Sequence, residues 1–173
     1  MLTLYYAPQS RATRINVLLH AMGMRDKVRL CTVDILRVDG GGRTDPRNPH
    51  PEAKVPALDT GHGVMTESNA IMLFLTDHFD SPLGRGIGHP DRGAYLTWLS
   101  WAAGGVEPWY VANAGGHGNE PLVRATWRGE AEIADRIETA LARGPWLLGE
   151  RYSAADILVA SVWLWAPDWA PDR

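Results

Sequence analysis

Hydrophobic positions in the first half of the chain recur with two different periods. Residues 2–6 and 27–35 alternate between two faces as strands do, whereas residues 10–23 repeat apolar side chains at helical spacing and end at Gly23. The predicted elements are, in order, strand, helix, strand, strand, strand and helix, over residues 2–6, 10–23, 27–35, 55–58, 63–66 and 67–79. Strands around the DTGHG turn must pair antiparallel, while a strand–helix–strand unit pairs parallel. We therefore expect a mixed four-stranded sheet.

The second half of the chain carries a different pattern. Residues 80–90 are rich in Gly and Pro and predict a linker between residues 1–79 and residues 91–173. The helical stretches that follow are residues 91–113, 122–143 and 152–166. The eight tryptophans all lie in this half, so the two halves differ in composition as well as in period. The expected architecture is an α/β unit followed by an all-helical unit.

Composition excludes several classes of function. The chain has 173 residues, of which 45% are apolar, and a formal net charge of −3 without a run of like charges. This argues against a disordered chain, a nucleic-acid surface and a polybasic membrane patch. No apolar stretch reaches the roughly 18 residues that span a bilayer, and the N-terminus lacks the features of a secretory signal. The single cysteine, Cys31, is compatible with the cytoplasm, where we expect the protein. The six histidines show no ligand spacing, so no metal is expected.

The dipeptide Val55-Pro56 opens the third predicted strand. Because proline has no backbone N–H, it is tolerated at the first residue or at the edge of a strand. It can also hold a cis bond that turns the preceding carbonyl and amide outward. Taken alone, the dipeptide is explained more simply as a strand that begins with proline.

Glu67-Ser68 stands where the next helix begins, with Thr66 as the expected N-cap. The free N–H groups and partial positive charge of a helix N-terminus suit a carboxylate ligand, and a serine hydroxyl can join that contact. An adjacent glutamate can hold an ammonium group, so the pair fits the head group of an amino acid. Taken alone, ordinary capping by Thr66 and Ser68 explains this motif more simply.

The predicted hairpin makes these two motifs neighbours, so an extended peptide could lie along the strand edge with its amino-acid end at the helix. With this VPAL…ES arrangement the chain resembles the cytosolic glutathione transferase family, in its serine- or cysteine-type, bacterial-like form. The resemblance implies a thioredoxin-like N-terminal domain in which Pro56 is cis and Val55 makes main-chain bonds to the cysteinyl part of glutathione. It also implies that Glu67 and Ser68 hold the γ-glutamyl end and that Lys54 meets the glycyl carboxylate.

A second segment, LYYAPQSRATRINVLL, is similar to the family's first strand, loop and helix. The resemblance implies that Ser10 donates a hydrogen bond to the glutathione sulfur, with the helix N-terminus adding positive potential. Both effects favour the thiolate, which is the nucleophile. Tyrosine-type members use a hydroxyl at the end of the first strand, where Tyr6 stands, and Tyr6 is therefore the alternative. Ser10 would serve equally as an N-cap, and Arg11 and Arg14 are expected at the surface.

A third segment matches the family's G-x-x-x-S-x-A-D signature through Gly149, Ser153, Ala155 and Asp156. Ser153 and Asp156 predict a capping box in which each side chain bonds a backbone N–H of the helix start, which is a role in folding. The tandem Trp-Ala-Pro-Asp repeat over 165–172 cannot continue a helix. Because family members usually continue further, we expect a shortened C-terminal domain and an altered co-substrate pocket.

The resemblance implies a glutathione transferase-like enzyme that acts in detoxification. It would take glutathione as co-substrate and deliver the sulfur to a small electrophile held between the domains, or assist an isomerisation, and it would form a homodimer. The alternative is a non-catalytic binding or regulatory protein of the same fold. A glutathione-dependent reductase would favour a cysteine near position 10, which is absent. The residues leave the electrophile and the choice among these reactions open.

Overall fold

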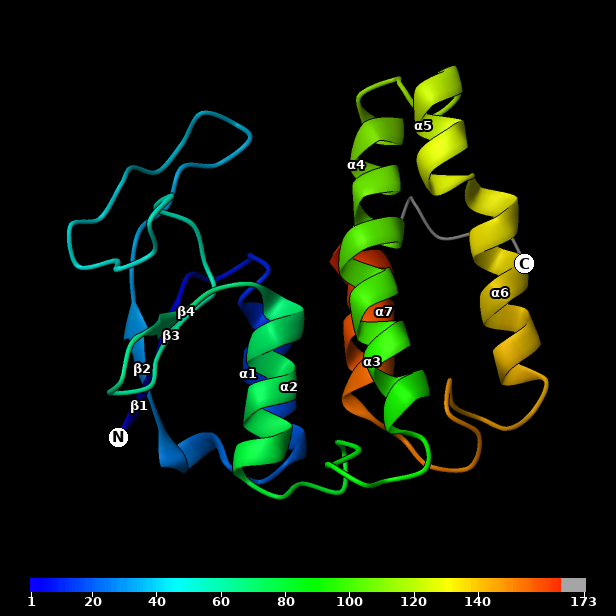
Figure 1. The fold of residues 1–173 in the computed structure, drawn as a ribbon. Helices are drawn as coiled ribbons and strands as arrows, with labels where there is room; N and C mark the ends of the chain where they lie inside the picture. Colours follow the sequence, from blue (N-terminus) through cyan, green and yellow to red (C-terminus); the bar gives the residue numbers. More distant parts are fainter. Residues whose placement is uncertain (166–173) are drawn as a thin grey trace. The chain divides into compact units, whose positions relative to one another are not determined.

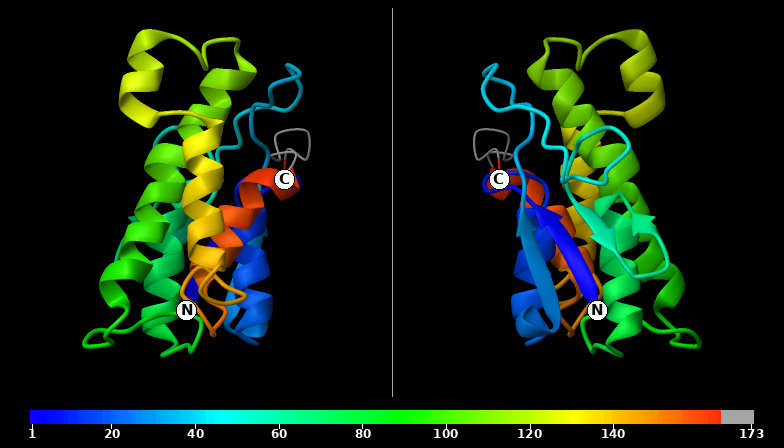
Figure 2. Two further views of the ribbon diagram at one scale, coloured as in Figure 1. Left: turned by 90° about the vertical axis from the view of Figure 1, so that its right-hand side faces the viewer. Right: turned by 90° about the vertical axis from the view of Figure 1, so that its left-hand side faces the viewer.

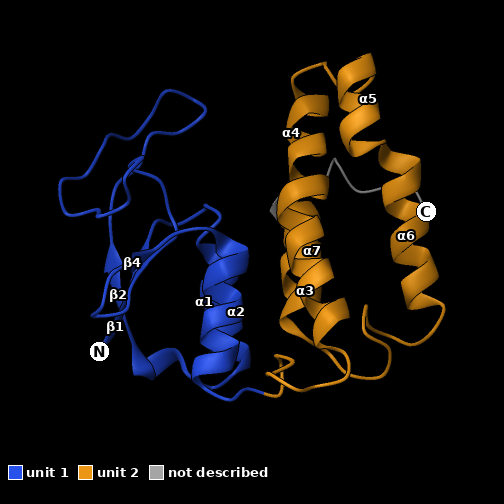
Figure 3. Ribbon diagram, viewed as in Figure 1, with its two compact units in different colours: residues 1–81 blue, residues 82–173 orange. Residues whose placement is uncertain are grey.

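The computed structural model describes residues 1–165 and divides the chain into two compact units, residues 1–81 and residues 82–173 (Figure 3). The sequence predicts that the Trp-Ala-Pro-Asp repeat does not continue the helix, and residues 166–172 of this repeat lie outside the described residues. No helix in the described part of the chain is both long and apolar enough to cross a bilayer.

The first unit is a mixed four-stranded sheet with helices on one face (Figures 1 and 2). Its elements are β1 (Leu2–Tyr6), α1 (Thr13–Ala21), the 3₁₀ turn η1 (Arg25–Lys27), β2 (Val28–Thr32), β3 (Ala57–Asp59), β4 (Val64–Met65) and α2 (Ser68–His78). The strand order is β2-β1-β3-β4, in which β1 and β2 run parallel and the other pairs antiparallel. The predicted mixed sheet and thioredoxin-like unit are confirmed. The long connection between β2 and β3 contains no helical turn.

The core of this unit explains why the two helices lie side by side against the sheet. Leu4 of β1 and Leu58 of β3 are directly paired and fully buried. The helices contribute the fully buried side chains Ile15, Leu18, Leu19, Ile71, Met72 and Leu75. Burying each such side chain is worth about 1.5–3 kcal/mol, so the periodic apolar stripes that predicted these helices also dock them.

The second unit is all-helical, as predicted. Its elements are α3 (Arg92–Trp101), the π-helical segment η2 (Ala102–Val106), α4 (Glu107–Ala114), α5 (Pro121–Trp127), α6 (Glu130–Leu141) and α7 (Ala154–Trp165). The first three run as one continuous rod (Figure 1). A core cluster of buried residues joins the rod to the later helices: Val106, Trp109, Tyr110, Val123, Ile133 and Val162.

The single helix predicted over 122–143 is wrong, because the chain breaks between α5 and α6. Arg128 has φ 66° and Gly129 is extended at φ −159°. A side chain at position 129 would collide with the guanidinium of Arg124, which crosses this point to reach Glu132 at 3.4 Å. Glycine therefore leaves the space for that ion pair, and the helix restarts after it.

The predicted capping box before α7 is half confirmed. The Asp156 carboxylate accepts the Ser153 backbone N–H at 2.8 Å, as expected. The Ser153 hydroxyl, however, donates to the same carboxylate at 2.8 Å instead of bonding a backbone N–H. A third bond at 2.8 Å comes from the Leu147 N–H, so Asp156 also anchors the preceding loop.

The segment before α3 is tied to the helical unit. The Leu83 carbonyl accepts the Ala154 N–H at 2.9 Å, and the buried Arg85 guanidinium donates to the Arg151 carbonyl at 3.1 Å. These bonds place residues 82–91 with the second unit.

Candidate functional site at one end of the sheet

Strand directions bring the predicted site residues to one end of the sheet. Tyr5 of β1 pairs with Ala57 of β3, so the end of β1 adjoins the start of β3. Leu58 pairs with Met65, so the end of β4 lies beside that same start. The loop carrying Ser10 follows β1, Lys54, Val55 and Pro56 precede β3, and Glu67 and Ser68 follow β4. The backbone of every residue predicted for the site is therefore gathered here.

Val55 joins the strand edge to the loop that follows β1. Its side chain is buried in a cluster with Ala7, Ala12 and Val33, and the two alanines flank Ser10 in sequence. The Val55–Pro56 bond is cis, as the family resemblance implied. Neither the N–H nor the carbonyl of Val55 bonds another residue in the described part of the chain. Because backbone groups in a buried setting normally find a partner, this pair is available to the main chain of a ligand.

The start of α2 offers unpaired donors at the same end of the sheet. The first intrahelical bond runs from the Ile71 N–H to the Glu67 carbonyl at 2.9 Å, so the N–H groups of Ser68, Asn69 and Ala70 have no helical partner. Ser68 is 9% exposed, and its hydroxyl bonds no other described residue. Together with the partial positive charge of the helix end, these groups suit a carboxylate.

Glu67 occupies a backbone conformation that side chains rarely adopt. The expected N-cap Thr66 is wrong, because Glu67 holds that position with φ 68° and ψ 120° and makes no side-chain cap bond. Such angles cost of order 1–3 kcal/mol and cluster at functional sites. The exposed Glu67 carboxylate lies directly before the free helix donors, where an α-amino acid could meet both.

Ser10 and Tyr6 differ in how their hydroxyls are used. The Ser10 hydroxyl donates to the Ala7 carbonyl at 2.6 Å and accepts the Ala12 N–H at 3.2 Å. Ser10 therefore stabilises the turn before α1, whose N-cap is Ala12 rather than Ser10. Tyr6 is half-buried against the Val55 cluster, and its hydroxyl bonds no other described residue. Donation from Ser10 to a thiolate would require its proton to leave the Ala7 carbonyl.

The charged residues near the site differ in exposure: Lys54 and Arg11 are exposed, whereas Arg14 is buried. The Lys54 ammonium pairs with the Glu52 carboxylate, and the two side chains are 69% and 63% exposed. This contact lowers the pKa of Glu52 through the hydrogen bond from Lys54. Arg11 is exposed as expected, but the surface position predicted for Arg14 is wrong, because Arg14 is only 5% exposed.

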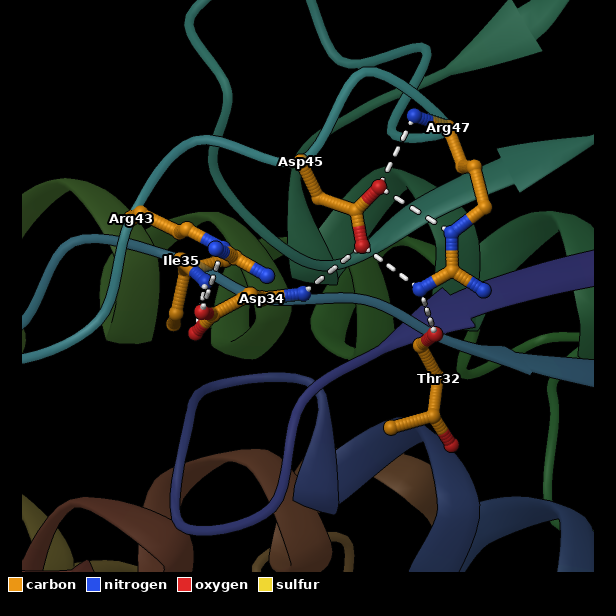
Figure 4. Close-up of polar contacts among 6 residues, drawn as sticks. All are labelled: Thr32, Asp34, Ile35, Arg43, Asp45 and Arg47. Carbon is orange, nitrogen blue, oxygen red and sulfur yellow. Dashed lines mark hydrogen bonds and ion pairs between the residues drawn. The ribbon is translucent and has the colours of Figure 1, made fainter.

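Two residues that sequence reasoning missed organise the connection that leads into Val55. The Asp45 carboxylate binds Arg47, and the Asn48 side chain donates to the Lys54 carbonyl at 2.9 Å (Figure 4 shows the Asp45 contacts). The Arg47 guanidinium beside Asp45 holds the pKa of that carboxyl well below its usual range. The signal for both was their position before proline in DPRNP, since Asp-Pro and Asn-Pro favour turns.

Comparison with known proteins agrees with this geometry. The model of the glutathione S-transferase N-terminal domain matches residues 4–83, and that of the C-terminal domain matches residues 66–172. The disulfide-bond oxidoreductase YfcG of Escherichia coli (strain K12) is 30% identical over 191 aligned positions, covering 100% of this chain and 82% of YfcG.

Solved structures share the fold. A glutathione S-transferase from Actinobacillus pleuropneumoniae is 27% identical with a TM-score of 0.76, covering 98% of this chain and 80% of that one. A sphingomonad glutathione S-transferase complexed with glutathione shares the fold at 23% identity and a TM-score of 0.73, covering 98% and 85% of the two chains. The chain therefore belongs to the glutathione S-transferase family.

Proposed function

We propose that the protein binds glutathione at the end of the sheet and activates its thiol for attack on a small electrophile. One observation carries this proposal. The N–H and carbonyl of Val55 and the first N–H groups of α2 all lack a hydrogen-bond partner among the described residues, and they lie at the same end of the sheet. A protein of this fold without a ligand site would not need both sets of unpaired backbone groups. A tripeptide with a free α-amino-acid end can use the two together.

Each group has a distinct task in this proposal. The Val55 N–H and carbonyl pair with the cysteinyl part of glutathione, as in an added strand. The Ser68 hydroxyl and the α2 N–H groups hold the γ-glutamyl carboxylate, while Glu67 holds the ammonium group. Lys54 exchanges Glu52 for the glycyl carboxylate. These contacts fix the thiol at the loop that carries Ser10.

The chemistry then depends on ionising that thiol. A hydrogen bond from Ser10, with Tyr6 as the alternative donor, stabilises the thiolate relative to the thiol. The thiolate forms a carbon–sulfur bond to the electrophile, and the leaving group departs with its electron pair. In an addition or an isomerisation the same sulfur adds to the substrate without a leaving group at that step.

A second candidate, disulfide reduction, is favoured by the similarity to YfcG, which is named as a disulfide-bond oxidoreductase. Here the thiolate attacks a disulfide, forming a mixed disulfide with glutathione and releasing one thiolate. A second glutathione thiolate attacks the mixed disulfide, giving oxidised glutathione and the second thiol. Because glutathione supplies both thiols, the lack of a cysteine near position 10 does not exclude this reaction.

Glutathione titration by calorimetry tests the binding step. We expect Ser68→Ala to weaken binding by roughly 10- to 100-fold, because a charge-assisted hydrogen bond is worth about 1.5–3 kcal/mol. Turnover with an aryl halide, compared with turnover of a dialkyl disulfide, then separates the two reactions. Wild-type protein that does not bind millimolar glutathione would leave the non-catalytic alternative in place.

We further propose a cytoplasmic homodimer. Light scattering coupled to size-exclusion chromatography checks the assembly, and a monomer across the micromolar range would contradict it.

A further inference from the structure

Asn48 makes two side-chain hydrogen bonds that close the segment leading to Val55. Its amide oxygen accepts the His50 N–H at 3.1 Å, and its amide nitrogen donates to the Lys54 carbonyl at 2.9 Å. The first contact requires the oxygen on the side of His50, so the orientation of the amide is set by its own neighbours. The donor is thereby directed at the Lys54 carbonyl.

The Lys54 carbonyl and the Val55 N–H belong to one peptide unit. That unit is planar, and in a trans peptide its carbonyl and N–H point in opposite directions. A bond that holds the carbonyl therefore fixes the direction of the N–H as well. Hydrogen bonding at the carbonyl also polarises the peptide and makes its N–H a better donor. Asn48 thus acts on the Val55 N–H without touching it.

Asn48 itself is held by the loop that contains Asp45 and Arg47. Its backbone N–H donates to the Asp45 carbonyl at 2.9 Å. The Asp45 carboxylate accepts the Asp34 N–H at 3.2 Å and the Arg47 guanidinium at 2.7 Å, and Arg47 also donates to the Thr32 carbonyl at 3.2 Å (Figure 4). The end of β2 is therefore connected through Asp45 to the segment that Asn48 closes.

We propose that Asn48 is a positioning residue for glutathione, which aims the Val55 N–H at the cysteinyl carbonyl of the ligand by holding the opposite side of the same peptide. This role rests on the proposed glutathione site. It concerns ligand affinity and leaves the reacting sulfur to other groups.

The test compares Asn48→Ala and Asn48→Asp with wild type. Aspartate keeps the shape and the acceptor for His50 but replaces the donor by an oxygen that repels the Lys54 carbonyl. We expect the Kd for glutathione to rise roughly 3- to 10-fold in Asn48→Ala and further in Asn48→Asp. The kcat at saturating glutathione should stay within about twofold of the wild-type value. The lost contact stabilises bound glutathione equally in the ground state and in the transition state, so its loss weakens binding without slowing the chemical step. Asn119→Ala, at an exposed position of the second unit, is the matched control.

A readout at Val55 separates positioning from loosening of the fold. The amide proton chemical shift of Val55 should change in Asn48→Ala, because its peptide unit loses the hydrogen bond at the Lys54 carbonyl, while the Tm stays within a few degrees of wild type. If wild type binds glutathione and both variants bind it within twofold of wild type, the role of Asn48 is overturned and the site stands. If wild type does not bind glutathione, the proposed function and this inference both fail.

Discussion

Replacing Glu67 by glycine separates the stability of the protein from its binding of glutathione. Glu67 has φ 68° and ψ 120°, a region in which the Cβ atom of an L-residue is crowded. Strain of this kind costs of order 1–3 kcal/mol, and glycine removes it. Glycine also gives the unfolded chain more freedom, which costs roughly 0.5–1 kcal/mol. The difference predicts that Glu67→Gly stabilises the protein by about 1 kcal/mol.

The same change removes the carboxylate proposed to hold the ammonium group of glutathione. Because Glu67 is exposed, that contact is screened and worth about 0.2–1 kcal/mol. We therefore expect roughly two- to fivefold weaker binding. A more stable protein that binds its ligand less well would show that the carboxylate is kept at this strained position for the site.

Denaturant unfolding and glutathione calorimetry measure the two effects, and Glu67→Ala is the matched variant. Alanine lacks the carboxylate but keeps the Cβ atom, so it should bind as weakly as glycine without the gain in stability. A glycine variant that is less stable than the alanine variant by roughly 0.5–1 kcal/mol would show that the backbone at this position is not strained.

Three further predictions concern the loop, the helical unit and the thiol. Asp45→Asn should destabilise the protein near neutral pH, and the difference from wild type should shrink below about pH 4. Arg47 lowers the pKa of Asp45 in the folded state. The contribution of Asp45 to the free energy of unfolding is therefore present above the ordinary aspartate pKa and is lost as pH falls. Asp156→Ala should destabilise by roughly 2–4 kcal/mol in thermal unfolding, because two buried N–H groups and one hydroxyl lose their acceptor. Ser10→Ala should raise the pKa of the bound glutathione thiol, followed by thiolate absorbance, while Tyr6→Phe should leave it unchanged.

A specific result would contradict each of the predictions for Asp45, Asp156 and Ser10. An Asp45→Asn effect on stability that is the same at pH 3 and pH 7 would contradict the ion pair between Asp45 and Arg47 as its cause. An Asp156→Ala variant as stable as wild type would mean that the loop finds other acceptors. A shifted thiol pKa in Tyr6→Phe alone would move the activating role from Ser10 to Tyr6.

The sequence predicted the parts of the fold that depend on local pattern. The strand and helix periods, with a short hairpin that had to be antiparallel, were enough to specify the mixed sheet. They also brought Val55 and Ser68 to one end of it, because strand direction alone decides which ends meet. The buried stripe of α1, Ile15, Leu18 and Leu19, was visible as helical spacing.

What escaped prediction depends on contacts between distant residues or on backbone angles without a residue signature. Positive φ at Glu67 and Arg128 has no glycine or asparagine to announce it. The bond from Asn48 to the Lys54 carbonyl arises only once the loop has folded back on itself. Burial of Arg14 could not be read from a helix that shows one apolar stripe.

A heteronuclear NMR titration with glutathione is the most direct test of the proposed site, because it reports binding and its location together. We expect saturable chemical-shift changes, at up to millimolar glutathione, that are largest for the amides of Val55, Ser68, Asn69 and Ala70. Amides of α6, in the second unit, should move least. The absence of shifts at the Val55 and α2 amides, or saturable shifts confined to other parts of the chain, would contradict a glutathione site at the end of this sheet.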